Sequence, residues 1–458
     1  MKRFLNQIFT RHNNSKRTHN SPHTQPTAEA EKPSLPSKAA KAPRPSKKKN
    51  SDKDSPDNWY EQLQKQPLKE NVSRFIDLNL DHDLLHGIFD LGFHYCTPIQ
   101  AQTLPFTLMR SDAIGHSQTG TGKTAAFLIT IINALLTQPY QGSRFAGEPR
   151  AVVIAPTREL ALQIAKDAQA LCKYCPLKIA TLIGGIDYEK QRQLIEHQII
   201  DIVIATPGRL IDFMYQKALY LDQVEILVLD EADRMLDMGF MPQVKQIVSA
   251  TPPKECRQTL LFSATFTAEI LTLAERWTEN AVRVAITPEH VTTKNIQQHF
   301  YLVSTDEKRK VLLNTLRQPE VKRAIVFVNR RDETRRLCDF LTKNKVHAAI
   351  LSGEIAQNAR LRTLEGFRSG KIPVLVATDV AGRGIHVDDI SHVINFSLPE
   401  DPDDYIHRIG RTGRAGSSGI AISFACEDDS FMIPALEALL AEPIQCQRPP
   451  AQVLESGA

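Results

Sequence analysis

A glycine-rich run, SQTGTGKT, occupies residues 117–124 between two apolar segments. Residues 112–115 before it have the length of a short buried strand, and residues 125–132 after it have the composition of a helix. Glycines in such a turn let backbone N–H groups curl around phosphates, and the N-terminus of the following helix adds partial positive charge. Lys123 would reach the β- and γ-phosphates, and the Thr124 hydroxyl would bind Mg²⁺. The predicted phosphate-binding residues are Gly120, Thr121, Gly122, Lys123 and Thr124.

Apolar, β-branched segments alternate with helical segments from about residue 75 onward. Continuous apolar strands between helices predict parallel sheets that are covered on both faces. Ligands of such sheets bind at the carboxyl ends of the strands. The pattern predicts two tandem α/β domains of similar design, and the second has no glycine-rich Lys-Thr run. The predicted strands lie at residues 112–115, 151–154, 179–183, 202–204, 226–229 and 259–262, and at 324–328, 348–351, 374–377, 392–396 and 420–424.

Composition separates a basic arm from a mildly acidic body. Residues 1–49 hold 12 Lys or Arg and 2 Asp or Glu, a net charge of +10, whereas the remainder holds 44 and 50, a net charge of −6. The arm is poor in apolar residues, which predicts disorder. Either it binds nucleic acid without sequence preference or it is a plain solvated tail. The predicted boundaries are 1–72 for a disordered basic extension, 73–286 and 294–430 for the two domains, and 431–458 for a C-terminal tail.

The remaining composition narrows the class of protein. No apolar run approaches the ~20 residues that cross a bilayer, so an integral membrane protein is not expected. Seven scattered cysteines, an odd number, indicate a reducing compartment, and we expect a cytoplasmic protein. Cys172 and Cys175 form a lone C-x-x-C without a second pair, so no zinc site is predicted. Residues 1–12 are compatible with an amphipathic helix, a transit peptide or a plain tail.

Acidic and basic clusters complete the predicted triphosphate chemistry. Asp230 directly follows an apolar strand, where a carboxylate would hold Mg²⁺, partly through water. Glu231 is then placed to orient and deprotonate an attacking water molecule. The run HRIGRTGR at residues 407–414 supplies positive charge for the γ-phosphate through Arg411 and Arg414.

The run at residues 230–233, together with some ten other motifs in the same order, resembles the DEAD-box family of RNA helicases from about residue 75 to 431. The resemblance implies two RecA-like domains that use ATP and Mg²⁺. The run GFHYCTPIQ at residues 92–100 is similar to the family's adenine-reading motif. The resemblance therefore assigns the adenine edge to Gln100 and an aromatic packing role on the base to Phe75.

The same resemblance implies RNA contacts and residues that couple the ATP site to them. The groups are amides, hydroxyls and arginines, which suit sugar and phosphate and imply binding that is independent of sequence. The coupling residues are Asp233, Ser263, Thr265 and Asp379. The implied RNA-binding residues are Arg158, Gly185, Thr206, Arg209, Arg330, Gln357, Arg360 and Thr378.

One position departs from the family pattern. His386 stands where family members generally have an aspartate that contacts the ATP ribose, so that contact is in doubt, although an imidazole can still form a hydrogen bond. Within the family, residues 382–387, 398–405 and 433–440 look like the bacterial RhlB type. That resemblance implies a role in RNA decay with ribonuclease E or another decay protein as partner.

The expected activity is RNA-stimulated ATP hydrolysis that locally separates duplex RNA. ATP and single-stranded RNA would both favour the closed form of the two domains, so each would tighten binding of the other. Three alternatives remain open at this point. They are an ATP-gated RNA clamp or scaffold, an RNA remodelling factor in ribosome assembly, and a DNA helicase.

Overall fold

The computed structural model describes residues 58–70, 72–116, 120–286, 296–352, 355–382, 387, 389–413 and 418–454. The chain divides into two units, residues 1–54 and 55–458, and the first lies outside the described residues. Within the described part of the second unit, the strands form two seven-stranded sheets. We call the parts built on these sheets the first lobe and the second lobe.

The sheet of the first lobe is entirely parallel, in the order β3-β4-β2-β5-β6-β1-β7. Its central strands are short and fully buried, which agrees with the continuous apolar runs from which they were predicted. Strand β1 enters the phosphate loop, and β5 ends immediately before Asp230. The strands are β1 (Ala113–His116), β2 (Ala151–Ile154), β3 (Ile179–Leu182), β4 (Ile202–Ala205), β5 (Ile226–Leu229), β6 (Gln258–Ser263) and β7 (Val282–Ala285).

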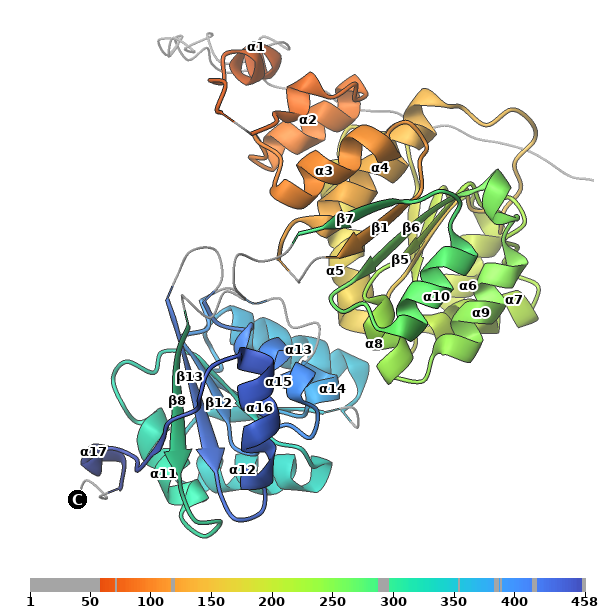
Figure 1. The fold of residues 1–458 in the computed structure, drawn as a ribbon. Coiled ribbons are helices and arrows are strands. Elements are labelled where there is room, and N and C mark those ends of the chain that lie inside the picture. The colour runs from red at the N-terminus through yellow and green to blue at the C-terminus, as the bar shows by residue number, and fades with distance from the viewer. Residues whose placement is uncertain are drawn as a thin grey trace, which may run out of the picture. The chain divides into compact units, whose positions relative to one another are not determined.

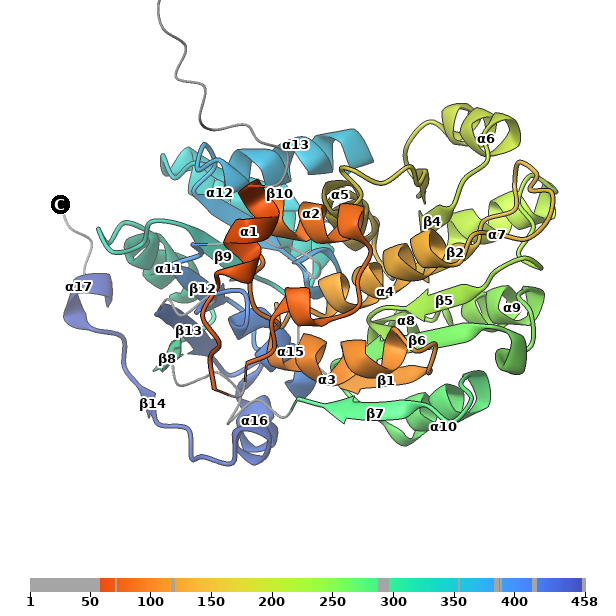
Figure 2. The same ribbon diagram turned by 90° about the horizontal axis from the view of Figure 1, so that it is seen from above.

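Helices cover both faces of this sheet (Figures 1 and 2). Alternate strand residues divide between two apolar clusters: Val153 packs with α1, α2, α4 and α5, and Val152 packs with α7 to α10. The core is therefore two layers with the sheet between them. The helices are α1 (Asn58–Gln64), α2 (His82–Asp90), α3 (Pro98–Thr107), α4 (Lys123–Thr137), α5 (Arg158–Leu171), α6 (Tyr188–His197), α7 (Pro207–Tyr215), α8 (Ala232–Asp237), α9 (Met241–Ala250) and α10 (Ala268–Trp277).

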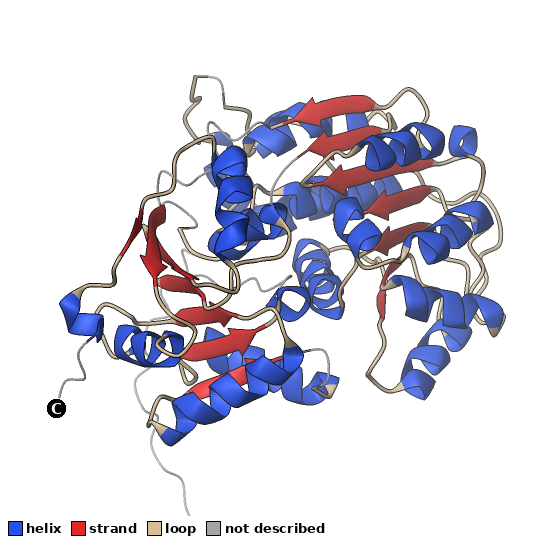
Figure 3. Ribbon diagram, turned by 60° about the horizontal axis from the view of Figure 1, so that its bottom comes forward, coloured by secondary structure: helices blue, strands red, loops and turns tan. Residues whose placement is uncertain are grey.

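The second lobe repeats this design with a parallel sheet in the order β10-β11-β9-β12-β13-β8-β14. Figure 3 shows strands with helices on both faces. Its strands are β8 (Ile296–Leu302), β9 (Ala324–Phe327), β10 (Ala348–Leu351), β11 (Val374–Ala377), β12 (His392–Asn395), β13 (Gly419–Ala425) and β14 (Cys446–Gln447). Its helices are α11 (Lys308–Leu316), α12 (Arg331–Lys343), α13 (Gln357–Arg368), α14 (Asp379–Gly382), α15 (Pro402–Ile409), α16 (Ile433–Leu440) and α17 (Ala451–Leu454).

The predicted tandem α/β architecture is confirmed, and each predicted strand is present to within two residues at either end. Strands β7, β8 and β14 were not predicted. Strand β7 is an edge strand with one buried residue, and β8 has three buried residues among seven. Half-exposed strands near a sheet edge carry polar residues, so they lack the continuous apolar run of a central strand.

The predicted disordered extension, residues 1–72, includes a segment that the structure describes as ordered. Residues 58–70 and 72 are described, and α1 is a helix, although residues 1–57 and 71 lie outside the described part. Trp59 and Leu63, four residues apart, place their side chains in the apolar cluster of α2. The Trp59 ring stacks on His86 with centroids 4.2 Å apart. Two large apolar side chains on one helical face therefore order a segment whose composition is otherwise polar.

The predicted C-terminal tail packs on the second lobe as far as residue 454. Strand β14 extends the sheet by pairing with β8. The side chain of Leu436 is fully buried, and Asn314 Nδ2 donates a hydrogen bond of 3.0 Å to the carbonyl of Val453. The segment thus covers the outer edge of the sheet, which would otherwise present unpaired backbone groups. None of the helices that the structure describes is long and apolar enough to span a membrane.

We predict that Gly115→Ala destabilises the first lobe by about 1–3 kcal/mol because a Cβ there overpacks the core. The added atom would lie 2.5 Å from the Phe262 ring, which is fully buried. The matched control is Gly208→Ala in the first turn of α7, where a Cβ meets nothing within 4 Å. Thermal unfolding of both variants measures the difference, and equal midpoints would contradict this account of β1 packing.

Candidate functional site

The phosphate loop joins the carboxyl end of β1 to α4, which begins at Lys123. Gly120 and Gly122 have φ angles of +87° and +97°, a backbone conformation that favours glycine. A Cβ on Gly122 would lie 2.6 Å from Gln100 Nε2 and 2.7 Å from Thr97 Oγ1. Gly122 is therefore required both by its backbone angle and by close packing. Residues 117–119 of the predicted cradle lie outside the described part.

Lys123 and Asp230 form a buried ion pair, with 3.1 Å between Nζ and Oδ1 and with side chains 5% and 0% exposed. Burial acts to lower the pKa of Lys123, but the nearby carboxylates of Asp230 and Glu231 outweigh it and raise this pKa. Burial raises the pKa of Asp230, and the neighbouring Glu231 acts in the same direction. The structure thus brings the predicted loop lysine and the predicted metal-binding aspartate together. The carboxyl groups of Asp230 and Glu231 outnumber the single ammonium group of Lys123.

The acidic pair has unused acceptor atoms. Asp230 Oδ2 and Glu231 Oε2 are buried without a hydrogen-bond partner among the described residues. Glu231 has a φ of +53°, an uncommon conformation for a residue with a side chain. Buried carboxylate oxygens of this kind fit a hard divalent cation such as Mg²⁺, for which Thr124 at the start of α4 stays the predicted hydroxyl ligand.

The predicted coupling residues of the first lobe form one hydrogen-bond network. Asp233 Oδ2 accepts from the backbone N–H groups of Ala264 at 3.0 Å and Thr265 at 2.8 Å. The Thr265 hydroxyl donates to the same oxygen, and the Asp233 N–H donates to Ser263 Oγ. Burial alone would raise the pKa of Asp233, but Lys123 and these N–H groups lower it. Helix α8 is therefore tied to the end of β6 by an ionised carboxylate.

A pocket of about 310 Å³ extends from the phosphate loop toward the start of α3. Gln100 lines it, although its amide also serves the protein: Oε1 accepts from Thr97 N at 2.8 Å and Nε2 donates to the Gly122 carbonyl at 3.0 Å. The residues that line the pocket are Phe93, Tyr95, Thr97, Gln100, Gly120, Gly122, Lys123, Thr124, Ala125, Leu160, Gln163, Asp167 and Glu231.

Phe75 does not line this pocket. Its side chain is fully buried, at 0% exposure, and belongs to the same apolar cluster as side chains of α2 and α4, so its packing on the base stays a prediction. The aromatic side chains in the pocket are Phe93, which is 38% exposed, and Tyr95. The adjacent Gly92-Phe93 pair lies only seven residues before Gln100, and this proximity was the available signal in the sequence.

In the second lobe, several polar side chains surround Arg408, which is 1% exposed. Its guanidinium forms two bonds with the predicted coupling residue Asp379, at 2.5 and 2.7 Å, and also donates to Asn329 and Asn395. Sequence reasoning gave no role to Arg408 itself. Arg411 is 3% exposed and lines a small pocket with Asp379 and Arg408, whereas Arg383, His386 and Arg414 lie outside the described residues.

Several residues predicted to bind RNA lie together. Arg158 Nη1 donates to Gln357 Oε1 at 3.2 Å, and Gln357 Nε2 donates to Glu159 at 2.9 Å. Arg360 pairs with the same Glu159 at 2.7 Å. Gly185, with a φ of +78°, leaves room for Arg158, since a Cβ there would lie 2.3 Å from Nη1.

The other predicted RNA contacts lie at strand ends. Thr206 precedes α7, and the Arg209 guanidinium lies 5.1 Å from the Tyr188 ring centroid. Burial lowers the pKa of Arg209, and its Nε and Nη1 have no hydrogen-bond partner among the described residues. Thr378 is 7% exposed after β11, and Arg330 is exposed at the start of α12. Among the described residues, no hydrogen bond or ion pair joins these four side chains to one another.

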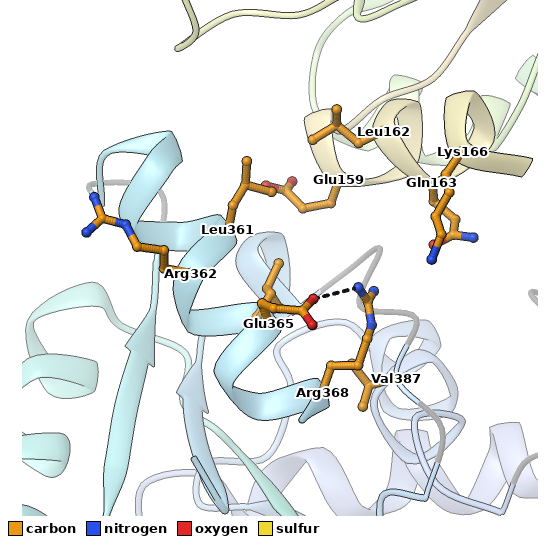
Figure 4. A pocket seen from close by; sticks show the side chains of 10 residues that line it. Glu159, Leu162, Gln163, Lys166, Leu361, Arg362, Glu365, Arg368 and Val387 are labelled. Carbon is orange, nitrogen blue, oxygen red and sulfur yellow. Dashed lines mark hydrogen bonds and ion pairs between the residues drawn. The ribbon is translucent and has the colours of Figure 1, made fainter. Parts of the chain in front are cut away.

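A further pocket of about 380 Å³ is lined by side chains of α5 and α13 and by Val387. Figure 4 shows Glu159, Leu162 and Lys166 on α5, and an ion pair of 3.3 Å between Glu365 and Arg368 on α13. None of the predicted ATP-binding residues lines this pocket.

Comparisons with known proteins agree with this geometry. The DEAD/DEAH box helicase family matches residues 97–273, and the helicase conserved C-terminal domain matches residues 307–416. The chain is 58% identical over 387 residues to the ATP-dependent RNA helicase RhlB of Pseudomonas putida, which covers 84% of this chain and 97% of that protein. The corresponding RhlB of Shewanella denitrificans is 43% identical, over 82% of this chain and 87% of that protein.

The fold also resembles solved structures. S. cerevisiae Dbp5 bound to RNA and ADP BeF3 matches with a TM-score of 0.73 and 32% identity, over 82% of this chain and 96% of that one. The two tandem sheets are thus RecA-like. They carry the phosphate loop, the acidic run and the arginines of the second lobe. The chain belongs to the DEAD-box family of ATP-dependent RNA helicases and, within it, to the RhlB type.

Proposed function

We propose that this RNA helicase binds single-stranded RNA without sequence specificity, separates short duplexes locally, and acts in RNA decay or remodelling. The observation that carries the proposal is the chemistry of the predicted RNA contacts. They present guanidinium, amide and hydroxyl groups at the carboxyl ends of strands, and such groups suit phosphate and sugar. The matched structure of Dbp5 is bound to RNA, which supports RNA as the ligand.

The proposed chemistry assigns one role to each part of the ATP site. Mg²⁺, held by Asp230 and Thr124, would neutralise charge on the phosphates. Glu231 orients the attacking water and takes its proton, and Lys123 binds the β- and γ-phosphates. Arg411 and Arg414 add positive charge at the γ-phosphate, while Asp233, Ser263, Thr265 and Asp379 couple the site to RNA. The buried, unpartnered oxygens of Asp230 and Glu231 support this assignment.

The proposal keeps the domain boundaries at 73–286 and 294–430, with the first boundary preceded by the ordered helix α1. A cytoplasmic location is also part of it. The seven cysteines are free thiols, which is the usual state in a reducing compartment. Ribonuclease E, or another decay protein, is the proposed partner because of the similarity to the RhlB type.

We expect Glu231→Gln to reduce RNA-stimulated ATP turnover at least about 100-fold, since an amide cannot accept the proton of the attacking water. ATP and RNA affinities should persist because the side chain keeps its size. Steady-state hydrolysis and equilibrium binding measure the two effects. The control is Glu255→Gln, an exposed glutamate of the same lobe, which should hydrolyse normally. Undiminished turnover in Glu231→Gln would show that another group is the base.

Arg209→Ala should weaken binding of single-stranded RNAs of unrelated sequence equally, by about tenfold, because its Nε and Nη1, which have no hydrogen-bond partner among the described residues, would meet phosphate. The slope of the logarithm of the binding constant against the logarithm of the salt concentration should fall in magnitude by about one. The control, Arg283→Ala, removes an arginine that is 58% exposed on the edge strand β7. Titrations of two RNAs at several salt concentrations test the proposal, and a loss confined to one sequence would contradict it.

The partner proposal predicts that the chain and ATP together accelerate cleavage of a structured RNA by purified ribonuclease E. An unstructured RNA of the same composition should be cleaved at an unchanged rate, since it needs no strand separation. Glu231→Gln should abolish the acceleration. Stimulation without ATP turnover would instead favour a clamp or scaffold, and no stimulation would remove ribonuclease E as the partner.

A further inference from the structure

One acidic residue of the ATP pocket has no assigned role. Asp167 lies on α5 and lines the pocket together with Leu160 and Gln163. Positions 160, 163 and 167 share one face of a helix, so α5 forms one wall of the pocket. The aromatic side chains of Phe93 and Tyr95 line the same pocket.

The Asp167 carboxylate is only partly satisfied by the protein. Its Oδ1 accepts a hydrogen bond of 2.8 Å from Gln163 Nε2, and no other side chain bonds to Oδ2 among the described residues. Within the same residues, no Lys or Arg forms an ion pair with it. Burial raises the pKa of the half-buried Asp167, while the hydrogen bond from Gln163 and the charge of Lys166 act in the opposite direction. A carboxylate in this setting gains most from a ligand that donates a hydrogen bond.

The nucleoside offers few donors, and the pocket offers few free acceptors. The only donor groups of an adenine nucleoside are the 6-amino group and the ribose hydroxyls. The Gln100 amide oxygen already accepts from Thr97 N, and one of its amide protons is used by the Gly122 carbonyl. Asp167 is thus an acceptor that is held in place by Gln163 and not committed elsewhere.

We propose that Asp167 determines nucleoside specificity by accepting a hydrogen bond from a donor group of the bound nucleoside. The donor is either a ribose hydroxyl or the 6-amino group, which share this chemistry. Gln163 is a positioning residue that fixes the carboxylate through the 2.8 Å bond. The inference rests on the proposed assignment of this pocket to ATP.

The test compares affinities of the full chain for ATP, 2′-deoxy-ATP, 3′-deoxy-ATP and purine riboside triphosphate, which lacks the amino group. In the unchanged chain, one of these analogues should bind about tenfold more weakly than ATP. In Asp167→Ala, ATP affinity should fall by a similar factor and the preference over that analogue should disappear. A purely structural role would weaken all four nucleotides equally and leave their ratios unchanged, which would overturn the proposal.

Two further variants keep the result interpretable. Asp222→Ala removes an exposed aspartate of the same lobe and should leave all affinities and their ratios unchanged. Gln163→Ala should reduce the same ratio in part, and its failure to do so would remove Gln163 from the proposal. Lys123→Ala should weaken every triphosphate. If Lys123→Ala binds them normally, the pocket assignment itself is wrong, and that outcome is distinct from unchanged ratios in Asp167→Ala.

Discussion

The buried contact between Lys123 and Asp230 joins the two halves of the ATP site in the first lobe. It connects the start of α4 to the end of β5, which are separated by more than 100 residues in the sequence. A lysine without this partner would be unfavourable at 5% exposure, because a buried charge needs an opposite one. Two carboxyl groups, those of Asp230 and Glu231, surround the single positive charge of Lys123. This excess of carboxyl groups makes the site suitable for a divalent cation. Folding and chemistry thus depend on the same pair.

The second lobe is organised by a comparable interaction. Arg408 is nearly inaccessible and donates to side chains at the ends of β9, β11 and β12. A guanidinium with several donors in one plane is suited to hold several acceptors at once. Loss of this residue would leave Asp379, Asn329 and Asn395 without a common partner. The loops that carry Arg411 and Thr378 therefore take their positions from an arginine that need not touch a ligand.

Whether a site residue could be predicted depends on how close in sequence the residues that identify it lie. The loop glycines, Lys123 and the acids after β5 were found because each lies next to a strongly apolar segment. Asp233 and Thr265 were assigned by resemblance, and the structure adds the reason: the Asp233 carboxylate accepts hydrogen bonds from two backbone N–H groups directly after β6. Phe75 was also assigned by resemblance, and the structure buries it in the core, because an aromatic residue near a binding motif can also complete the core. Arg408 was missed because its partners Asp379, Asn329 and Asn395 are brought together only by folding. Asp167 was missed because only folding places this face of α5 in the pocket lining.

The sequence by itself determined the alternation of apolar strands and helices, the parallel class of both sheets, and the identity of the phosphate loop, because these signals depend on neighbouring residues. It did not determine the edge strands β7, β8 and β14, which are half exposed, or the ordering of α1 through Trp59 and Leu63. The pairing of Lys123 with Asp230 and the wall that places Asp167 in the pocket were decided only by the tertiary structure. Burial and hydrogen bonding of a side chain depend on residues far away in the chain, and no local pattern records which of them will meet.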